Sequence, residues 1–178
     1  MASGDIPMWK PENVLHEGAE ATVTSGSWLG RQVVLKSRRA RSYRHPDLDR
    51  RLTRQRLAVE ARVLSRLSSV GFPSPKLMFL DQRNSSMLLS RIEGRTLYEL
   101  LKSDESSGEE LFSLGGLIRR LHEIGISHGD LTTHNVMSTE EGELHIIDFG
   151  LSRQSPELEH LGLDLQVLRE CLGASHSD

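Results

Sequence analysis

The sequence predicts an α+β fold with two small lobes: an N-terminal lobe built on a five-stranded antiparallel sheet with one helix, and a reduced, mainly helical C-terminal lobe. Three observations predict it. Short β-branched and apolar runs separated by turn signals dominate the first half of the chain. One long segment among them has apolar residues at helical spacing. The second half combines helical patterns with a single strand hairpin.

The bulk composition restricts the class of protein. The chain has 178 residues, 37% hydrophobic and 26% charged, with a formal net charge of −3. One cysteine, Cys171, excludes an intrachain disulfide and favours a reducing compartment. Aromatic residues make up 4%, so stacking on single-stranded nucleic acid is not expected to dominate. No apolar run reaches the roughly 20 residues of a membrane span, so we expect a cytoplasmic protein with no membrane association, and the nucleus is also open to it.

The N-terminal lobe is expected to span residues 12–92, after a flexible lead-in at residues 1–11. Residues 13–23 have the pattern of a strand, a turn with Gly18 at its tip, and a second strand. Residues 31–36 predict a third strand because they are rich in β-branched and aliphatic side chains.

The remaining elements of this lobe are one helix and two strands. Residues 47–68 carry leucine and valine at helical spacing, and Asp47 could cap the helix that they predict. Residues 76–81 and 85–90 predict strands joined by a polar turn, and these complete the sheet.

The C-terminal lobe is expected to span residues 93–178. A short helix over residues 96–101 would begin after Thr96 as its cap. Residues 110–124 carry apolar side chains along one face and predict a longer helix. A last helix is expected to start at residues 162–168.

The densest chemical signal lies in residues 128–135 and 148–150, which read His-Gly-Asp-Leu-Thr-Thr-His-Asn and Asp-Phe-Gly. Two short apolar runs around a Glu140-Glu141-Gly142 turn lie between them and predict a strand hairpin. That hairpin would bring Asn135 and Asp148 to the same end. A carboxylate beside an amide oxygen suits Mg²⁺, which takes oxygen ligands and usually keeps phosphate oxygens as partners.

This order of motifs is typical of phosphoryl transfer in the protein-kinase superfamily. Asp130 is then placed to orient a hydroxyl group or a water molecule. Lys36 ends the third strand, where a kinase lysine contacts the α- and β-phosphates of ATP. Glu60 is expected to pair with Lys36, the alternative being an intrahelical ion pair with Arg56. We therefore predict ATP and Mg²⁺ as cofactors and Asp130 and Lys36 as the catalytic residues.

Other candidate residues surround the nucleotide or support the loop. Besides Lys36 and Glu60, the residues expected to contact ATP are Leu15, Gly18, Val23, Leu89, Ser90 and Ile92. Backbone groups near Ser90 and Ile92 would meet the adenine edge, whereas Gly18 alone is also compatible with a plain hairpin turn. His128 is expected to support the predicted catalytic loop, residues 128–135. Asp164 either accepts backbone N–H groups of that loop or merely caps the last helix.

The segment after Gly150 departs from the usual kinase pattern. It is short and has no Ala-Pro-Glu motif before Asp164. Gly129 stands where the arginine of a His-Arg-Asp motif would grip a loop phosphate. Activation by loop phosphorylation and a docking shelf for a peptide substrate are therefore not expected. His122 is interpreted as a packed or capping histidine rather than a ligand.

The positive charge is concentrated in residues 31–66. This segment contains twelve arginine or lysine residues and three acidic residues, a net charge of +9 that leaves −12 for the rest of the chain. Two interpretations stay open: a solvated helix face, or a surface that meets a phosphate backbone or an acidic partner.

Together, these residues resemble the atypical kinase and ATPase subunit of the KEOPS/EKC complex, the PRPK family, which is related to the RIO kinases. The resemblance covers roughly residues 12–172. Its matching segments are Gly18-Ala19-Glu20-Ala21, Lys36, Tyr43-Arg44-His45-Pro46, Glu60-Ala61-Arg62, Ile92-Glu93-Gly94, residues 128–135 and 148–152, and Asp164-Leu165.

The resemblance implies a minimal two-lobe kinase fold with weak serine/threonine kinase activity and an ATPase role. That role would support threonylcarbamoyladenosine (t6A) modification of tRNA. The implied partners are an ASKHA-fold catalytic subunit and a small subunit on the N-terminal lobe, with the basic segment 31–66 near tRNA. Such proteins continue into further helices and an arginine-rich tail, so we expect a truncated chain or an unusually small C-terminal lobe.

Two alternative functions are compatible with the same residues. One is a scaffold subunit that binds a nucleotide for assembly and turns it over weakly or not at all. The other is a small-molecule phosphotransferase, which shares the logic of the HxDxxxxN motif.

Overall fold

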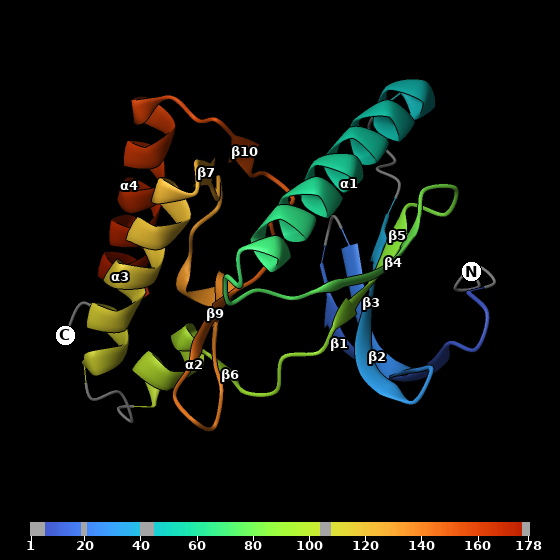
Figure 1. Ribbon diagram of the computed structural model, residues 1–178, viewed down its shortest axis with the longest axis horizontal. Coiled ribbons are helices and arrows are strands. Elements are labelled where there is room, and N and C mark those ends of the chain that lie inside the picture. Colours follow the sequence, from blue (N-terminus) through green and yellow to red (C-terminus); the bar gives the residue numbers. More distant parts are fainter. Residues whose placement is uncertain (1–5, 19–20, 40–44, 104–107, 176–178) are drawn as a thin grey trace. The chain divides into compact units, whose positions relative to one another are not determined.

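The structure, a computed structural model, divides into two compact units that are joined by the chain (Figure 1). It describes residues 6–18, 21–39, 45–103 and 108–175. The N-terminal unit comprises Met1–Ser65 and Pro75–Arg91, and the C-terminal unit comprises Arg66–Ser74 and Ile92–Asp178. Residues 66–74 therefore belong with the second half of the chain, although they continue the helix of the first.

The N-terminal unit contains the expected five-stranded antiparallel sheet, in the order β1-β2-β3-β5-β4. Its strands are β1 (Lys10–Glu17), β2 (Ala21–Trp28), β3 (Arg31–Arg38), β4 (Leu77–Asp81) and β5 (Ser86–Ser90). Because side chains alternate along a strand, Val33 and Leu35 share one face of β3. They pack there with Ile6 and Leu88 in a buried apolar cluster.

Residues 6–11 are not the flexible lead-in that the sequence suggested. Ile6 is buried in the apolar cluster, and Trp9 packs against it. The indole Nε1 of Trp28 donates a hydrogen bond to the carbonyl oxygen of Pro7 at 3.0 Å, and β1 already begins at Lys10. The segment is held because its apolar side chains complete the core. Residues 1–5 lie outside the described part of the chain.

Helix α1 (Pro46–Ser69) follows the predicted periodicity. Leu57, Ala61 and Leu64 are buried at helical spacing, which gives the helix one apolar face. The helix begins at Pro46, a favoured first helical residue because proline lacks an N–H group that the first turn could not pair anyway. Asp47 therefore lies within the first turn instead of capping the helix, and its carboxylate pairs with Arg50.

The C-terminal unit combines helices with two small sheets. Its helices are α2 (Leu97–Lys102), α3 (Glu109–Glu123), the 3₁₀ turn η1 (Thr133–Asn135) and α4 (Leu158–Ser175). One sheet contains β6 (Arg95–Thr96), β8 (Val136–Ser138) and β9 (Leu144–Ile146), and the other pairs β7 (Ile126–Ser127) with β10 (Arg153–Gln154). The predicted hairpin is β8–β9. The two-residue strands were not predicted, because so short a ladder has no periodic pattern.

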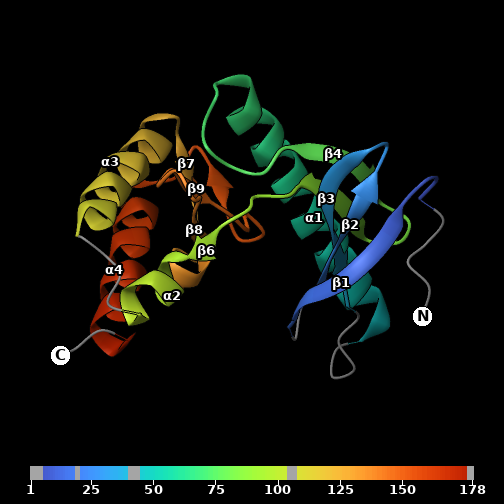
Figure 2. The ribbon, with the colours of Figure 1, turned by 90° about the horizontal axis from the view of Figure 1, so that it is seen from below.

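Local signals explain where these helices lie. Thr96 caps α2 in a capping box with Glu99, as the sequence predicted for Thr96. Helix α4 begins at Leu158, four residues before the expected start, and it lies side by side with α3 (Figure 1 and Figure 2). Within the described residues, no helix is both long and apolar enough to cross a membrane.

The packing of the first described residues gives a stability prediction. Ile6→Ala should lower the free energy of unfolding by about 2–3 kcal/mol, because it removes buried apolar atoms and leaves a cavity. Met8→Ala is the matched control; Met8 is 68% exposed, so its loss should cost no more than about 0.5 kcal/mol. Urea denaturation measures both, and equal effects of the two changes would contradict the packing described.

Candidate active site

Strand β3 and helix α1 are joined by a buried ion pair. Lys36 Nζ lies 2.7 Å from Glu60 Oε1, and the two side chains are 7% and 1% exposed. The predicted pairing of Glu60 with the lysine is therefore present. The charges are held away from water, which makes the ion pair stronger and its geometry more restricted than at a surface.

A second cation shares the Glu60 carboxylate, and sequence reasoning missed it. Arg38 Nη2 lies 2.6 Å from Glu60 Oε2, and the Arg38 side chain is 6% exposed. The sequence contained a signal for this contact, because side chains two residues apart on a strand share a face and Arg38 follows Lys36 at that spacing.

The expected nucleotide contacts on β1 and β2 have different surroundings. Leu15 is 50% exposed, and Val23 lies opposite Lys36 in the β2–β3 ladder. The N–H group of Gly18 donates to the carbonyl oxygen of Ala21 at 2.9 Å, which closes the β1–β2 turn. Residues 19–20 at its tip lie outside the described part.

The expected adenine contacts lie where β5 ends. Leu89 is buried, and the next residue, Ser90, ends the strand. The Ser90 N–H group donates to the carbonyl oxygen of Lys76 at 2.9 Å. Ile92 belongs to the C-terminal unit.

His128 organises the predicted catalytic loop, residues 128–135, from within. Its side chain is fully buried; Nε2 lies 2.9 Å from the carbonyl oxygen of Ile147, and Nδ1 accepts the N–H group of Asp130 at 3.2 Å. These partners assign a neutral imidazole with its proton on Nε2. The ring also packs on Phe149, with centroids 5.1 Å apart. One side chain thus links the loop to the Asp-Phe-Gly segment.

Asn135 and Asp148 are brought to the same end of the β8–β9 hairpin. Val136 pairs with Ile146, and the Ile147 N–H group donates to the carbonyl oxygen of Asn135 at 2.9 Å. Asp148 follows directly, with a left-handed φ of 61°, a conformation that aspartate tolerates better than most residues.

The amide of Asn135 also connects it to Asp130. Its Nδ2 donates to the backbone oxygen of Asp130 at 2.8 Å and to the carboxylate at 3.2 Å. The amide oxygen is then the Asn135 atom that could ligate a cation. Among the described residues, no group of three or more histidine, cysteine or acidic side chains could hold a metal ion unaided. Asn135 and Asp148 therefore fit a cation that takes its remaining ligands from phosphate or water, as Mg²⁺ does.

Asp164 holds the catalytic loop by its backbone. The carboxylate is 1% exposed and accepts the N–H groups of His128 at 2.7 Å and Gly129 at 2.8 Å. Since Asp164 lies inside α4 and not at its start, the alternative of a simple helix cap does not apply.

His122 is a third donor to this carboxylate, with Nε2 3.0 Å from Asp164 Oδ2. From the sequence alone, His122 is interpreted as a packed or capping residue, because nothing local in α3 reveals its partner, 42 positions away. Burial alone would raise the pKa of Asp164. The hydrogen bonds from His122, Gly129 and His128 outweigh burial and hold the pKa below its ordinary value.

Gly129 is required by the path of the short segment after Gly150. Its φ is +83°, and a Cβ atom there would lie 2.3 Å from the backbone oxygen of Leu151. No side chain fits between these backbones. The departure from the His-Arg-Asp pattern thus has a steric cause. The following chain is held by β10, which pairs with β7.

The basic segment 31–66 is only partly available at the surface. Lys36 and Arg38 are buried at Glu60, and Arg66 donates to the carbonyl oxygen of Ile124 at 2.5 Å. The exposed arginines on α1, apart from Arg66, are Arg50, Arg51, Arg54 and Arg62. Arg41 and Arg44, together with Tyr43 of the Tyr-Arg-His-Pro segment, lie outside the described residues. The described face that could meet phosphates is smaller than the charge count suggested.

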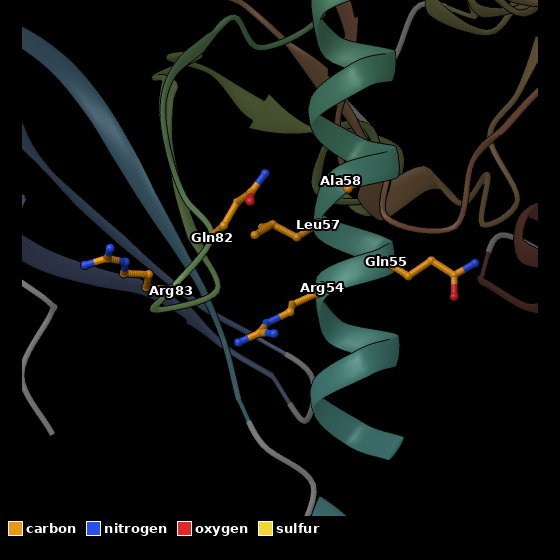
Figure 3. A pocket seen from close by; sticks show the side chains of 6 residues that line it. All are labelled: Arg54, Gln55, Leu57, Ala58, Gln82 and Arg83. Atoms are coloured by element: carbon orange, nitrogen blue, oxygen red, sulfur yellow. The ribbon is translucent and has the colours of Figure 1, made fainter. Parts of the chain in front are cut away.

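A surface pocket in the N-terminal unit lies between α1 and the β4–β5 turn (Figure 3). Its volume is about 430 Å³, and its lining residues are Arg54, Gln55, Leu57, Ala58, Gln82 and Arg83. Figure 3 shows Leu57 of the helix pointing toward Gln82 of the turn. None of the lining residues is a predicted nucleotide contact, so this pocket does not report on the ATP site.

Comparisons with known proteins find a matching family model and similar sequences. The model of the lipopolysaccharide kinase (Kdo/WaaP) family matches residues 16–160. A probable bifunctional tRNA threonylcarbamoyladenosine biosynthesis protein of Methanothermobacter thermautotrophicus is 35% identical over 166 residues, which are 93% of this chain and 30% of that protein. The EKC/KEOPS complex subunit Tp53rkb of Mus musculus is 36% identical over 174 residues, covering 92% of this chain and 71% of that subunit.

The fold has a solved counterpart. The Rio2 kinase of Chaetomium thermophilum, in a complex with ADP and Mg²⁺ that contains phosphoaspartate, superposes with a TM-score of 0.72 at 18% identity. The match covers 96% of this chain and 57% of that one. The kinase-like fold predicted from the sequence is thereby confirmed. The chain spans 30% of the length of the bifunctional archaeal relative.

The first prediction from this geometry concerns Gly129. Gly129→Ala should destabilise the C-terminal unit by about 2–4 kcal/mol, because alanine must adopt a left-handed φ and displace the Leu151 backbone. Gly142→Ala is the control for φ alone, since Gly142 has a φ of +81° with nothing within 4 Å of the added Cβ. Thermal unfolding of the two variants separates clash from φ strain, and equal melting temperatures would contradict the close approach.

The second prediction concerns Asp164. Asp164→Asn should lower the free energy of unfolding at pH 7 by about 3 kcal/mol, because buried N–H groups lose a charged acceptor. The folded-state pKa of Asp164 is below its ordinary value of 3.8. The parent therefore carries this stability above that pH and loses it as the pH falls through the folded-state pKa.

Urea denaturation of parent and Asp164→Asn at pH 7 and at about pH 3 measures this difference. It should shrink on acidification. A difference that is the same at both pH values would show that the carboxylate charge does not contribute.

Proposed function

We propose that this chain is an ATP-dependent phosphotransferase, because it belongs to the PRPK family of kinase-like KEOPS subunits and to the family described by the Kdo/WaaP model. In its finer form, the proposal is an atypical serine/threonine kinase and ATPase that supports t6A modification of tRNA. The observation that carries it is the buried Lys36–Glu60 ion pair, because a lysine so held is suited to grip phosphates.

The N-terminal unit would hold the nucleotide. Lys36, oriented by Glu60 on α1, contacts the α- and β-phosphates of ATP in this proposal. The closed β1–β2 turn at Gly18 covers the phosphates, and the end of β5 at Ser90, with Ile92 beyond it, meets the adenine. Leu15, Val23 and Leu89 supply apolar contacts to the base.

The C-terminal unit would hold Mg²⁺ and the acceptor. Asn135 and Asp148 provide its oxygen ligands, and the ion when bound neutralises charge that develops on the phosphates. Asp130 orients the attacking hydroxyl group or water.

The short segment after Gly150 bears on the choice of acceptor. It runs from Leu151 into β10 and then α4, which leaves little chain to form a shelf for a peptide. We therefore favour water, or a serine presented by the chain itself or by a bound partner, over a free peptide.

The proposed partners are those of the relatives. The mouse relative is a subunit of the EKC/KEOPS complex, and the archaeal relative is described as a tRNA threonylcarbamoyladenosine biosynthesis protein. We propose that this chain acts with the ASKHA-fold subunit and the small subunit of such a complex, in the cytoplasm or nucleus. The exposed arginines of α1, including Arg51 and Arg54, could meet tRNA phosphates by charge.

The main prediction is about ATP turnover. Lys36→Ala and Asp130→Ala should each lower the rate of ATP hydrolysis by about 100-fold or more. Neither change should unfold the protein. In Lys36→Ala, Glu60 still pairs with Arg38. In Asp130→Ala, Asn135 still donates to the backbone oxygen at position 130. The measurement is phosphate release with and without tRNA and partner subunits. Circular dichroism checks the fold, and a folded variant as active as the parent would exclude the role assigned.

One other function is favoured by a specific observation. The Kdo/WaaP model belongs to a family described as lipopolysaccharide kinases, so the acceptor could be a sugar. ATP consumption with a panel of sugars and amino alcohols decides between the two. Turnover that responds to a sugar and ignores tRNA and partner subunits would favour the small-molecule reaction. ATP binding with no turnover in any condition would favour a nucleotide-bound scaffold.

A further inference from the structure

Arg66, in the last turn of α1, contacts two segments of the C-terminal unit that are far apart in the chain. Its Nη2 donates to the carbonyl oxygen of Ile124 at 2.5 Å, and its Nη1 lies 3.5 Å from Oε1 of Gln154. Ile124 is the C-cap residue of α3, where carbonyl groups lack partners within the helix and the helix dipole favours a cation. One guanidinium group thus joins the end of α3 to β10.

The two segments lie on either side of the residues proposed to act in catalysis. Strand β7 leads directly into His128, and β10 begins three residues after Gly150. Their ladder consists of two residue pairs, and the Ser155 N–H group adds a bond to the carbonyl oxygen of Gly125 at 2.9 Å. So short a two-stranded ladder has little stability of its own. Its position therefore depends on contacts from outside the ladder.

The backbone from which Arg66 extends is itself held in the C-terminal unit. Nη2 of Arg120, on α3, donates to the carbonyl oxygens of Val70 at 3.1 Å and Gly71 at 3.0 Å, just beyond the end of α1. The guanidinium of Arg120 also lies 5.7 Å from the centre of the buried Phe72 ring. The ends of α1 and α3 thus hold each other by reciprocal bonds from arginine to carbonyl oxygen. These bonds give Arg66 a defined position, although its side chain is exposed.

We infer that Arg66 is a positioning residue for the proposed phosphoryl transfer: by holding Ile124 and Gln154, it fixes the two strands that flank the predicted catalytic loop. A shift of β7 would move His128, whose Nδ1 accepts the N–H group of Asp130 at 3.2 Å. Arg66 therefore acts on Asp130 through the backbone. The inference rests on the proposed function, since Asp130 has an acceptor to orient only if ATP is turned over.

A purely stabilising role predicts a different result. Arg66 would then only tie α1 to α3, and its loss would lower the melting temperature while each folded molecule turned over ATP at the parent rate. A positioning role lowers kcat at saturating ATP and Mg²⁺ in molecules that are folded. Binding of ATP without Mg²⁺ is proposed to depend mainly on the N-terminal unit, so it should be unaffected.

The experiment compares the parent with Arg66→Met, which keeps an apolar stem and removes the guanidinium group. We expect kcat for ATP hydrolysis to fall about tenfold, because a small displacement of a catalytic group is costly. Kd for ATP in the presence of EDTA, measured by calorimetry, should change less than about twofold. Amide hydrogen exchange should accelerate in residues 124–129 and stay the same in the β2–β3 ladder.

Two further variants complete the test. Arg66→Lys keeps a charged donor and should restore kcat to within about threefold of the parent. Arg119→Met is the matched control, because Arg119 is 80% exposed and pairs with Glu123 on the same helix. It removes a guanidinium group from the same unit and should leave kcat and the exchange rates unchanged.

Four results would overturn the inference: a folded Arg66→Met with the parent kcat, a loss of ATP affinity in EDTA as large as the loss of kcat, unchanged exchange in residues 124–129, or a lysine variant no better than methionine. Should Arg66→Met fail to fold, Arg66→Gln keeps an uncharged donor and takes the same test. A parent without ATP turnover refutes the proposed function, and the parent assay alone reveals that outcome. The exchange rates then still decide whether Arg66 holds β7.

Discussion

A carboxylate removed from water needs donors around it, and this constraint organises the candidate site in both units. In the C-terminal unit Asp164, 1% exposed, accepts two backbone N–H groups of the catalytic loop and one imidazole N–H from α3. In the N-terminal unit Glu60, equally buried, accepts from two cations of β3. Each acid joins elements that are distant in the chain. The geometry of the loop and of the lysine depends on these two anchors.

In the loop of residues 128–135, the hydrogen bonds of Asp164 position further residues in turn. Asp164 fixes the backbone at His128, whose neutral ring then links Asp130 to the Ile147 carbonyl and packs on Phe149. Asp130 in turn accepts from Asn135. The groups proposed to hold Mg²⁺ and orient the acceptor are thus positioned by buried partners that never touch substrate. The short chain that follows can lie directly on the loop because Gly129 has no side chain.

Sequence reasoning succeeded where a signal was local or strongly periodic. The β8–β9 hairpin, the apolar face of α1 and the capping of α2 by Thr96 follow from patterns within a few residues. It failed where partners are remote. Ile6 was assigned to a loose lead-in because a lone isoleucine has no periodicity, and His122 was not recognised as a partner of Asp164.

For the candidate site the same division holds. Lys36, Glu60, Asp130, Asn135 and Asp148 were identified as candidates from the sequence alone, because their order and spacing match the kinase motifs and their side chains suit phosphate and Mg²⁺. Only the tertiary structure showed that Arg38 shares Glu60 and that Gly129 is required by the Leu151 backbone. The physical reason is that residue type and spacing report local conformation and chemical capacity. Burial and long-range hydrogen bonds are set by which elements pack together.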